Sequence, residues 1–334
     1  MGIVYVFGAG ASRHVGYPLA SEMGDGLINY MLSVESARNS AEFIVDRFGK
    51  PKNFEDLITE IQLLIDKLKD STKLRDRIER SNLGYSSSQM VQYMQQWFRE
   101  IRQSPAPLYT DFARRVIRSG DTVITFNYDD SLEKALRSIG RFDIGNGYGF
   151  PLTSDEAISE VRVLKLHGSI NWLVNFFSGA TGGVFAVDPG SSMGDFPVIH
   201  PIDLKFLGHE QSTGRVYKSG GAIPCLIMPG RNKQFFYDTS FGHEFAAFWD
   251  HLWQQAGFAL GECERMVICG YGLLPVDERA CSLLTKTRGK DTPVEVISGM
   301  QSERIAKEFK SAGFTDVSVP APYFEDWLKL DPRA

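Results

Sequence analysis

Short apolar runs alternate with amphipathic segments in the N-terminal and C-terminal parts of the chain. The runs are rich in β-branched and aromatic residues and end at glycine or polar residues, which is typical of buried strands. They lie at 4–7, 123–126, 161–169, 265–272, 293–298 and 316–320. Because the segments between them have the periodicity of helices, the pattern predicts an α/β fold: a Rossmann-like parallel sheet with helices on both faces.

Two longer segments interrupt this alternation within a single predicted domain, 1–334. The first, 20–105, carries apolar stripes at helical spacing, which predicts a helical insertion whose stripes pack inside the protein. One stripe follows a candidate N-cap at Asn53 and consists of Phe54, Leu57, Ile58, Ile61 and Leu64. Another surrounds Trp97. The second segment, 175–230, is rich in glycine and proline, which predicts a loop-rich small subdomain or a lid.

Composition narrows the class of protein further. The 334 residues carry a formal net charge of -5, which gives no overall attraction to nucleic acid or anionic lipid. The four cysteines form no CxxC pair, which argues against a zinc ribbon or a disulfide framework and favours reduced thiols. The first apolar run is too short to span a membrane and lacks the features of a signal peptide. We therefore expect a soluble, cytoplasmic protein that binds neither membranes nor nucleic acid directly.

Four of the predicted strands end in residues that suit a ligand better than a core. These ends have the sequences GAGAS, NYDD, HGS and GYG, in chain order. The carboxyl ends of parallel strands lie at one edge of a sheet, and ligands bind beyond that edge, so these residues are expected to line one crevice. The candidates are Gly8, Gly10, Ser12, Asn127, Asp129, His167 and Gly270.

Each strand end also admits a simpler interpretation. Glycines let the backbone approach a pyrophosphate, but a single GxG is a weak signal, and Arg13 stands where a third Rossmann glycine is expected. No acidic residue ends a second strand about 20 residues later, so hydride transfer is disfavoured. His167 could be a general base or a core histidine. Asn127, Asp129 or Asp130 could simply cap the following helix.

Taken together, the motifs resemble those of the sirtuin family. Gly8–Ser12 matches the family's Gly-Ala-Gly-Ile/Ala-Ser turn, and Gly16–Pro18 matches its Gly-x-Pro. Thr125–Asp129 corresponds to Thr-Gln-Asn-Ile-Asp, and Leu166–Gly168 to Leu-His-Gly, in the family's order. The paired cysteines of the zinc ribbon and the Asp-Phe-Arg of protein deacylases are missing, and Gly270–Gly272 replaces Gly-Thr-Ser. With these departures, the chain looks like the bacterial sirtuin-like proteins that hydrolyse NAD in antiphage defence.

The resemblance implies an NAD⁺ glycohydrolase that releases nicotinamide and ADP-ribose. In such an enzyme Asn127 would hold a water or a ribose hydroxyl, His167 would act as general base, and Asp129 would bind the nicotinamide carboxamide. The rest of NAD would lie against Gly8, Ala9, Gly10, Ser12, Arg13, Gly270 and Tyr271. Arg13 could equally be a solvated surface residue. NAD is then a substrate, and the reaction requires no metal.

Unchecked NAD hydrolysis would be toxic, so the resemblance also implies that the activity is gated. Homo-oligomerisation, a partner ATPase or another defence protein could supply the gate, with the helical insertion around Trp97 as a candidate interface. Two other functions stay open: a sensor that binds NAD or an ADP-ribose derivative without turnover, and an NAD-dependent protein deacylase or ADP-ribosyltransferase. The presence of both Asn127 and His167 favours catalysis over sensing.

Overall fold

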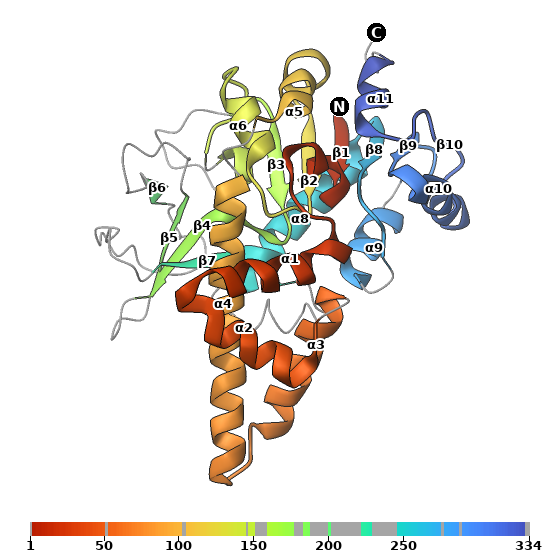
Figure 1. The fold of residues 1–334 in the computed structure, drawn as a ribbon. Helices are drawn as coiled ribbons and strands as arrows, with labels where there is room; N and C mark the ends of the chain where they lie inside the picture. Colours follow the sequence, from red (N-terminus) through yellow and green to blue (C-terminus); the bar gives the residue numbers. More distant parts are fainter. Residues whose placement is uncertain are drawn as a thin grey trace.

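The computed structural model describes residues 2–50, 53–101, 105–144, 146–150, 159–176, 183–187, 200–201, 222–228, 246–274, 277–286 and 289–330. Within them lies a six-stranded sheet in the order β10-β9-β8-β1-β2-β3. Its strands are β1 (Ile3–Phe7), β2 (Thr122–Thr125), β3 (Arg162–Lys165), β8 (Arg265–Cys269), β9 (Val294–Ile297) and β10 (Val317–Ser318). Every pairing in this sheet is parallel (Figure 1), which confirms the predicted α/β fold.

β1 lies inside the sheet, between β8 and β2, and all of its residues are buried. Phe7 pairs with Thr125 of β2 and with Cys269 of β8, so three neighbouring strands end at the same level. β3 continues this register, because Thr125 pairs with Lys165. The residues that follow these strands are therefore delivered to one edge of the sheet.

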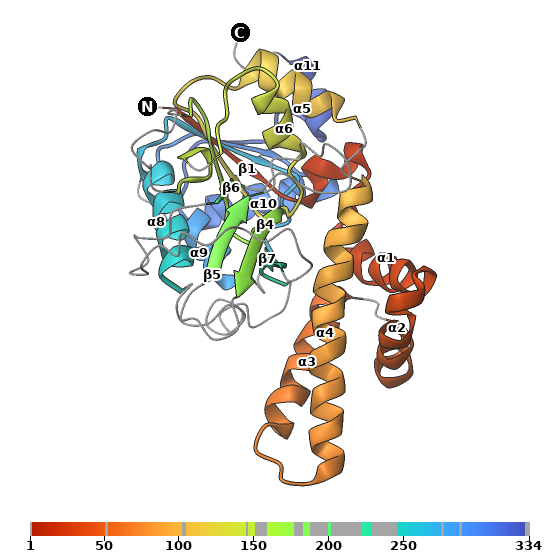
Figure 2. The ribbon, with the colours of Figure 1, turned by 90° about the vertical axis from the view of Figure 1, so that its left-hand side faces the viewer.

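Aromatic side chains of β1 hold one layer of helices against the sheet. Tyr5 and Phe7 pack against Phe112 at ring-centroid distances of 4.9 Å and 5.3 Å, and Phe7 meets Phe324 at 5.5 Å. These partners lie in η2 (Phe112–Val116), which continues α5 (Pro107–Asp111), and in α11 (Phe324–Lys329). Figure 2 shows α8 (Ala246–Glu262) on the opposite side. Both faces are covered, which explains the continuous apolar sequence of β1.

The other described helices of this α/β unit are short. They are α6 (Ser131–Arg137), η3 (Asn146–Tyr148), α9 (Glu278–Thr285), η6 (Gly299–Gln301) and α10 (Ser302–Ser311). Several of them follow the ends of strands, and η6 begins two residues after β9. α6 begins six residues after β2, and α9 follows the turn that leaves β8. The strand ends of interest are therefore flanked by helix N-termini.

Between β1 and β2 the chain forms a group of helices that projects from the sheet (Figure 2). It comprises η1 (Ala9–Val15), α1 (Ala20–Ser33), α2 (Glu35–Phe48), α3 (Phe54–Leu68) and α4 (Leu74–Ile101). Asn53 caps α3 by accepting a hydrogen bond from the Glu55 amide at 2.9 Å. The apolar stripe of α3 is buried except for Leu64, which is half-buried against the core, and the Trp97 ring of α4 packs directly on Gly26 of α1. Both predicted stripes thus pack within the protein.

A second, antiparallel sheet has the strand order β6-β5-β4-β7. Its strands are β4 (Gly168–Phe176), β5 (Gly183–Val187), β6 (His200–Pro201) and β7 (Ala222–Leu226). Gly168 turns the chain from β3 into β4 with a φ of 82°, and a Cβ atom there would lie 2.0 Å from the carbonyl oxygen of Cys225. Only glycine fits this turn. Most of the predicted subdomain 175–230 lies outside the described residues, and its role as a lid stays a prediction.

Candidate active site at the carboxyl edge of the sheet

The turns after β1 and β8 touch each other through backbone atoms. The Gly10 amide donates to the Gly270 carbonyl oxygen at 3.0 Å. Gly270 has a φ of 61°, and a Cβ atom added to it would lie 2.2 Å from the Ala11 amide nitrogen. A Cβ atom at Gly8 would meet the Cα atom of Tyr271 at 2.5 Å. These glycines let the two turns pack closely. The predicted contact of Gly8–Ser12 with a pyrophosphate stays a prediction.

Asn127 joins the first strand end to the second. Its Nδ2 group donates to the carbonyl oxygen of Gly8 at 2.9 Å and to Oγ of Ser12 at 3.0 Å. Because a carbonyl oxygen can only accept, the end of the side chain that faces Gly8 must be the NH₂ group. Oδ1 is then the atom of this side chain that can accept a hydrogen bond from a ligand. Asn127 does not cap α6, because Asp130 occupies the N-cap position.

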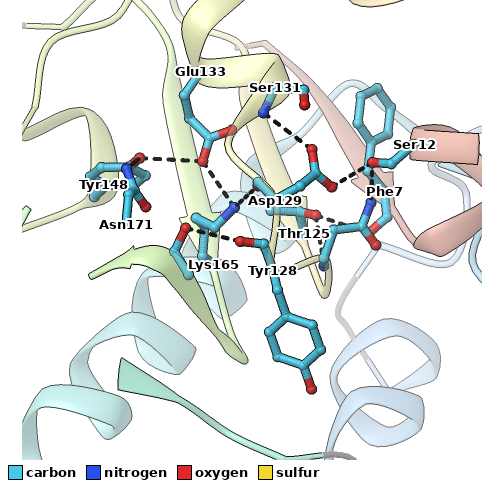
Figure 3. A network of polar contacts seen from close by, with 12 residues as sticks. Phe7, Ser12, Thr125, Tyr128, Asp129, Ser131, Glu133, Tyr148, Lys165 and Asn171 are labelled. Atoms are coloured by element: carbon cyan, nitrogen blue, oxygen red, sulfur yellow. Dashed lines mark hydrogen bonds and ion pairs between the residues drawn. The ribbon is translucent and has the colours of Figure 1, made fainter. Parts of the chain in front are cut away.

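Ser12 is the centre of a buried hydrogen-bond cluster. Its Oγ donates to Oδ2 of Asp129 at 2.6 Å (Figure 3) and lies 2.7 Å from the hydroxyl of Tyr109 in α5. A serine hydroxyl has a single proton, and here that proton forms the hydrogen bond to the Asp129 carboxylate. The Tyr109 hydroxyl must therefore donate to Ser12. Oδ1 of Asp129 accepts from the Ser131 amide at 3.1 Å. The cluster thus fixes the orientation of the Asp129 carboxylate from two sides.

Burial controls the protonation of two groups beside this cluster. It raises the pKa of the Tyr109 hydroxyl well above its usual range, and the Asp129 carboxylate adds to this effect, so Tyr109 keeps its proton. His14 packs edge-on against the Tyr109 ring at 4.8 Å, and its Nδ1 donates to the Ala11 carbonyl oxygen at 2.9 Å. Burial lowers the pKa of His14, so its imidazole is neutral at pH 7.

His167 lies at the third strand end and faces a carboxylate from the fourth. Its Nε2 is 3.4 Å from Oδ2 of Asp277, and both side chains are buried. Asp277 is the N-cap of α9, where its Oδ1 accepts from the Ala280 amide at 3.4 Å. The helix therefore holds the carboxylate in place against the imidazole of His167. In the sequence, Asp277 is visible only as an aspartate after the GYG turn.

Aromatic rings connect the second, third and fourth strand ends. The ring of Phe126 stacks on the ring of Tyr271 at 4.4 Å with an interplanar angle of 20°. Phe126 also contacts the His167 ring edge-on at 5.1 Å. The main chain of Tyr271 is held in turn, because its carbonyl oxygen accepts from the Ser298 hydroxyl at 3.2 Å. The expected contact of Tyr271 with NAD stays a prediction.

Arg13, a predicted contact of NAD, lies outside the buried cluster. Its side chain is 59% exposed and pairs with Glu22 at 3.1 Å, so it lies on the protein surface. A cavity lined by Tyr109, Asn127 and Asp129, among others, has room for about one water molecule. The described residues of the edge are therefore closely packed in this conformation.

Other kinds of site find no support among the described residues. No group of three or more histidine, cysteine, aspartate or glutamate side chains lies where it could hold a metal ion in that part of the chain. All four cysteines are free thiols. No described helix has both the length and the apolar character needed to cross a bilayer.

Fold and site together define a Rossmann-like α/β protein with a buried polar cluster and a histidine–carboxylate pair at its carboxyl edge. No protein-family model matches the chain, and no curated protein matches its sequence. Among solved structures, the chain is similar to a Sir2 homologue in complex with NAD, with a TM-score of 0.47 and 14% identity, covering 98% of this chain and 87% of that one.

Two further Sir2 homologues are similar at the same level. A variant in complex with ADP-ribose has a TM-score of 0.42 and 12% identity, with 98% of this chain and 90% of that chain covered. A variant in complex with 2′-O-acetyl-ADP-ribose has a TM-score of 0.39 and 14% identity, with 99% and 90% covered. Likenesses of this size do not establish a family or an activity for this chain.

Proposed function

We propose that this chain binds NAD at the carboxyl edge of the sheet and hydrolyses the bond between nicotinamide and ribose. One observation carries the proposal: at adjacent strand ends, the amide of Asn127 has its orientation fixed by hydrogen bonds, and the imidazole of His167 is backed by Asp277. The first two residues lie in motifs that resemble those of sirtuins. A fixed amide acceptor and an oriented base are the groups that a water-dependent cleavage of this bond requires.

Asn127 supplies the acceptor. Both hydrogens of its Nδ2 group are donated, to Gly8 and to Ser12, so Oδ1 is available to a water or to a ribose hydroxyl. Hydrogen-bonding an oxygen nucleophile in a fixed place converts a bimolecular encounter into a positioned attack. Asn127 donates three hydrogen bonds in all, because its main-chain amide also donates to Oγ1 of Thr125 at 3.1 Å.

His167 receives the proton. Water attacks C1′ of the ribose, the C1′–N bond breaks, and its electron pair leaves with nicotinamide, which departs neutral. The attacking water gives its proton to the imidazole, whose cationic form is stabilised by the carboxylate of Asp277 at 3.4 Å. ADP-ribose and nicotinamide are the products, and the proton returns to solvent.

Asp129 is suited to the nicotinamide carboxamide. Each oxygen of a carboxylate can accept more than one hydrogen bond, so Oδ1 and Oδ2 keep accepting capacity beside their bonds to Ser131 and Ser12. An amide N–H is a matching donor. The bonds from Ser12 and Ser131 would hold the carboxylate in place for that contact.

The compact edge supports gating of this activity. A dinucleotide is far larger than the cavity beside Asn127 and Asp129, which has room for about one water, so NAD bound there would require the residues that line it to move apart. The Phe126–Tyr271 stack is one contact that could separate, since it joins two turns and not two strands. A partner protein or oligomerisation that favours the open form would then switch the enzyme on.

The test is nicotinamide release from NAD⁺ by the purified protein, alone and with proteins encoded beside it. Asn127→Ala and His167→Ala are expected to lower the rate by about 10²-fold or more. Asn39→Ala is the matched control, because Asn39 is exposed on α2 and makes none of the hydrogen bonds described for the site. Equimolar nicotinamide and ADP-ribose, lost in the two site variants only, would establish hydrolysis. Tight NAD binding without release under every condition would instead identify a sensor.

A further inference from the structure

A lysine is buried completely beneath the site. Lys165 is the last residue of β3, and its side chain has no exposed surface. Its Nζ lies 2.9 Å from Oε1 of Glu133 in α6 and donates a second hydrogen bond to the carbonyl oxygen of Asp129 (Figure 3). Lys165 therefore bridges a strand, a helix and the turn that carries Asp129 and Asn127.

The ion pair continues into a buried polar network. Oε1 of Glu133 also accepts from the Tyr148 hydroxyl at 3.3 Å, which accepts from Nδ2 of Asn171 at 3.0 Å (Figure 3). Burial raises the pKa of Glu133, and the Lys165 charge opposes this shift. Such pairs contribute little net stability, because removing two charges from water costs about as much as their attraction returns. The ion pair alone therefore does not explain the second hydrogen bond of Lys165, to the carbonyl oxygen of Asp129.

The hydrogen bond from Lys165 to Asp129 connects the two halves of the candidate site. Lys165 precedes His167 by two residues, and Asp129 follows Asn127 by two residues. The neighbouring carbonyl of Tyr128 is also bound from this side, by the Ile170 amide at 2.9 Å and the Ser169 hydroxyl at 3.2 Å. Two successive carbonyl groups of the β2–α6 turn are thus tied to the segment that carries His167.

We propose that Lys165 is a positioning residue that locks the β2–α6 turn, and with it the Asn127 amide, to the strand end that carries His167. It acts through the main chain of Asp129 and touches no substrate atom. The kinetic part of this inference rests on the proposed function, but the positioning itself does not. No motif in the sequence assigns a task to this lysine.

A pair of variants separates positioning from ion pairing. Glu133→Gln removes the anionic partner but keeps the side-chain oxygen for Tyr148 and the contact from Lys165 to Asp129. Lys165→Met in that background removes the contact to Asp129 and leaves no buried charge unpaired, which protects the fold. Lys165→Met alone leaves the Glu133 carboxylate unpaired and serves as the measure of simple destabilisation. Glu133→Gln alone leaves the Lys165 ammonium without its anionic partner, so urea unfolding of all three variants first sets a temperature at which each is folded, and exchange and kinetics are measured there.

The exchange rates of amide hydrogens in the ligand-free protein report directly on the stability of the β2–α6 turn. The diagnostic amides are those of Asn127, Ser131 and Ile170, which bond to Thr125 Oγ1, Asp129 Oδ1 and the Tyr128 carbonyl oxygen. We expect them to exchange about tenfold faster in E133Q/K165M than in E133Q, with β1 amides unchanged. Equal exchange of the three amides in the two variants overturns the proposal.

The rate of nicotinamide release measures how the position of this turn affects catalysis. In an active enzyme we expect kcat to fall about tenfold or more from E133Q to E133Q/K165M, with KM changed less. Equal kcat values in the two variants overturn the proposal, since the ion pair alone would then explain the lysine. If the wild-type protein releases no nicotinamide under any condition, the proposed function fails, and the exchange result alone decides whether Lys165 positions the turn.

Discussion

The proton count around Ser12 makes a quantitative prediction about stability. Tyr109→Phe removes one hydroxyl and keeps the ring, which stacks on Phe7 at 5.9 Å. Ser12 Oγ would still donate to Asp129 and accept from Asn127, so no buried group loses its last partner. The loss is one neutral hydrogen bond, worth about 1 kcal/mol of unfolding free energy.

Ser12→Ala removes the centre of the same cluster and should cost more. The Tyr109 hydroxyl, one N–H of Asn127 and Oδ2 of Asp129 would each lose a partner. An unsatisfied buried group costs about 1–3 kcal/mol, and the cavity beside the cluster can admit about one water that satisfies part of this demand. We therefore expect Ser12→Ala to lower the unfolding free energy by about 3 kcal/mol, roughly three times the effect of Tyr109→Phe.

Urea unfolding of both single variants and the double variant is the assay. The double variant should be no less stable than Ser12→Ala alone, because the phenylalanine removes the hydroxyl that Ser12→Ala leaves unpaired. Addition of the two single losses in the double variant, or a Tyr109→Phe loss as large as that of Ser12→Ala, would show that Tyr109 does not donate to Ser12. The assignment of the Ser12 proton to Asp129 would then be wrong.

Two further variants probe the histidines of the site. Asp277→Asn keeps an oxygen that can accept from the Ala280 amide but loses the charge that faces His167. We expect kcat for nicotinamide release to fall by about tenfold or more, with the unfolding midpoint unchanged. An unchanged kcat would make the pair purely structural. Burial lowers the pKa of His14, so folding stability present above about pH 6.5 is lost as pH falls through the lower folded-state value. His14→Asn, which keeps a donor for the Ala11 carbonyl, should flatten the urea midpoint between about pH 7 and 5, and an equal slope would contradict this origin.

The sequence predicts the parallel sheet well because each strand is a short apolar run bounded by turn residues. β1, β2, β8 and β9 all lie where those runs are. The helix predicted around Trp97 begins much earlier in the structure, at Leu74, because its first turns are mostly polar and expose their few apolar residues, such as Leu74 and Ile78. β5 and β7 lie in a segment whose glycine-rich composition predicts loops. Their pairing with β4 depends on contacts between distant residues, which local composition does not encode.

Some residues of the candidate site can be predicted from the sequence, and others cannot. Asn127 and His167 are predictable, because residues that end parallel strands must share an edge. Tyr109 is not, since it reaches Ser12 from a helix placed by packing against β1, and nothing local to it marks a partner. Lys165 did leave a signal: a charged residue in the apolar run Val161–Leu166 must be paired if that run is a buried strand. Which groups pair with it follows only from the tertiary structure.

The helical insertion is tied to the site and is not an independent appendage. Nε2 of Gln95 in α4 donates to the carbonyl oxygen of Ile170 at 2.6 Å, and Ile170 in turn binds the Tyr128 carbonyl. The Phe98 carbonyl of α4 also accepts a hydrogen bond at 3.3 Å from the hydroxyl of Tyr17, which follows η1 in the chain. α3 and α4 form a projecting helical hairpin, and α4 continues from it to these contacts as one helix (Figure 2). A partner that displaces the hairpin would therefore act on the same turn that Lys165 holds, which is where the proposed gate would need to open.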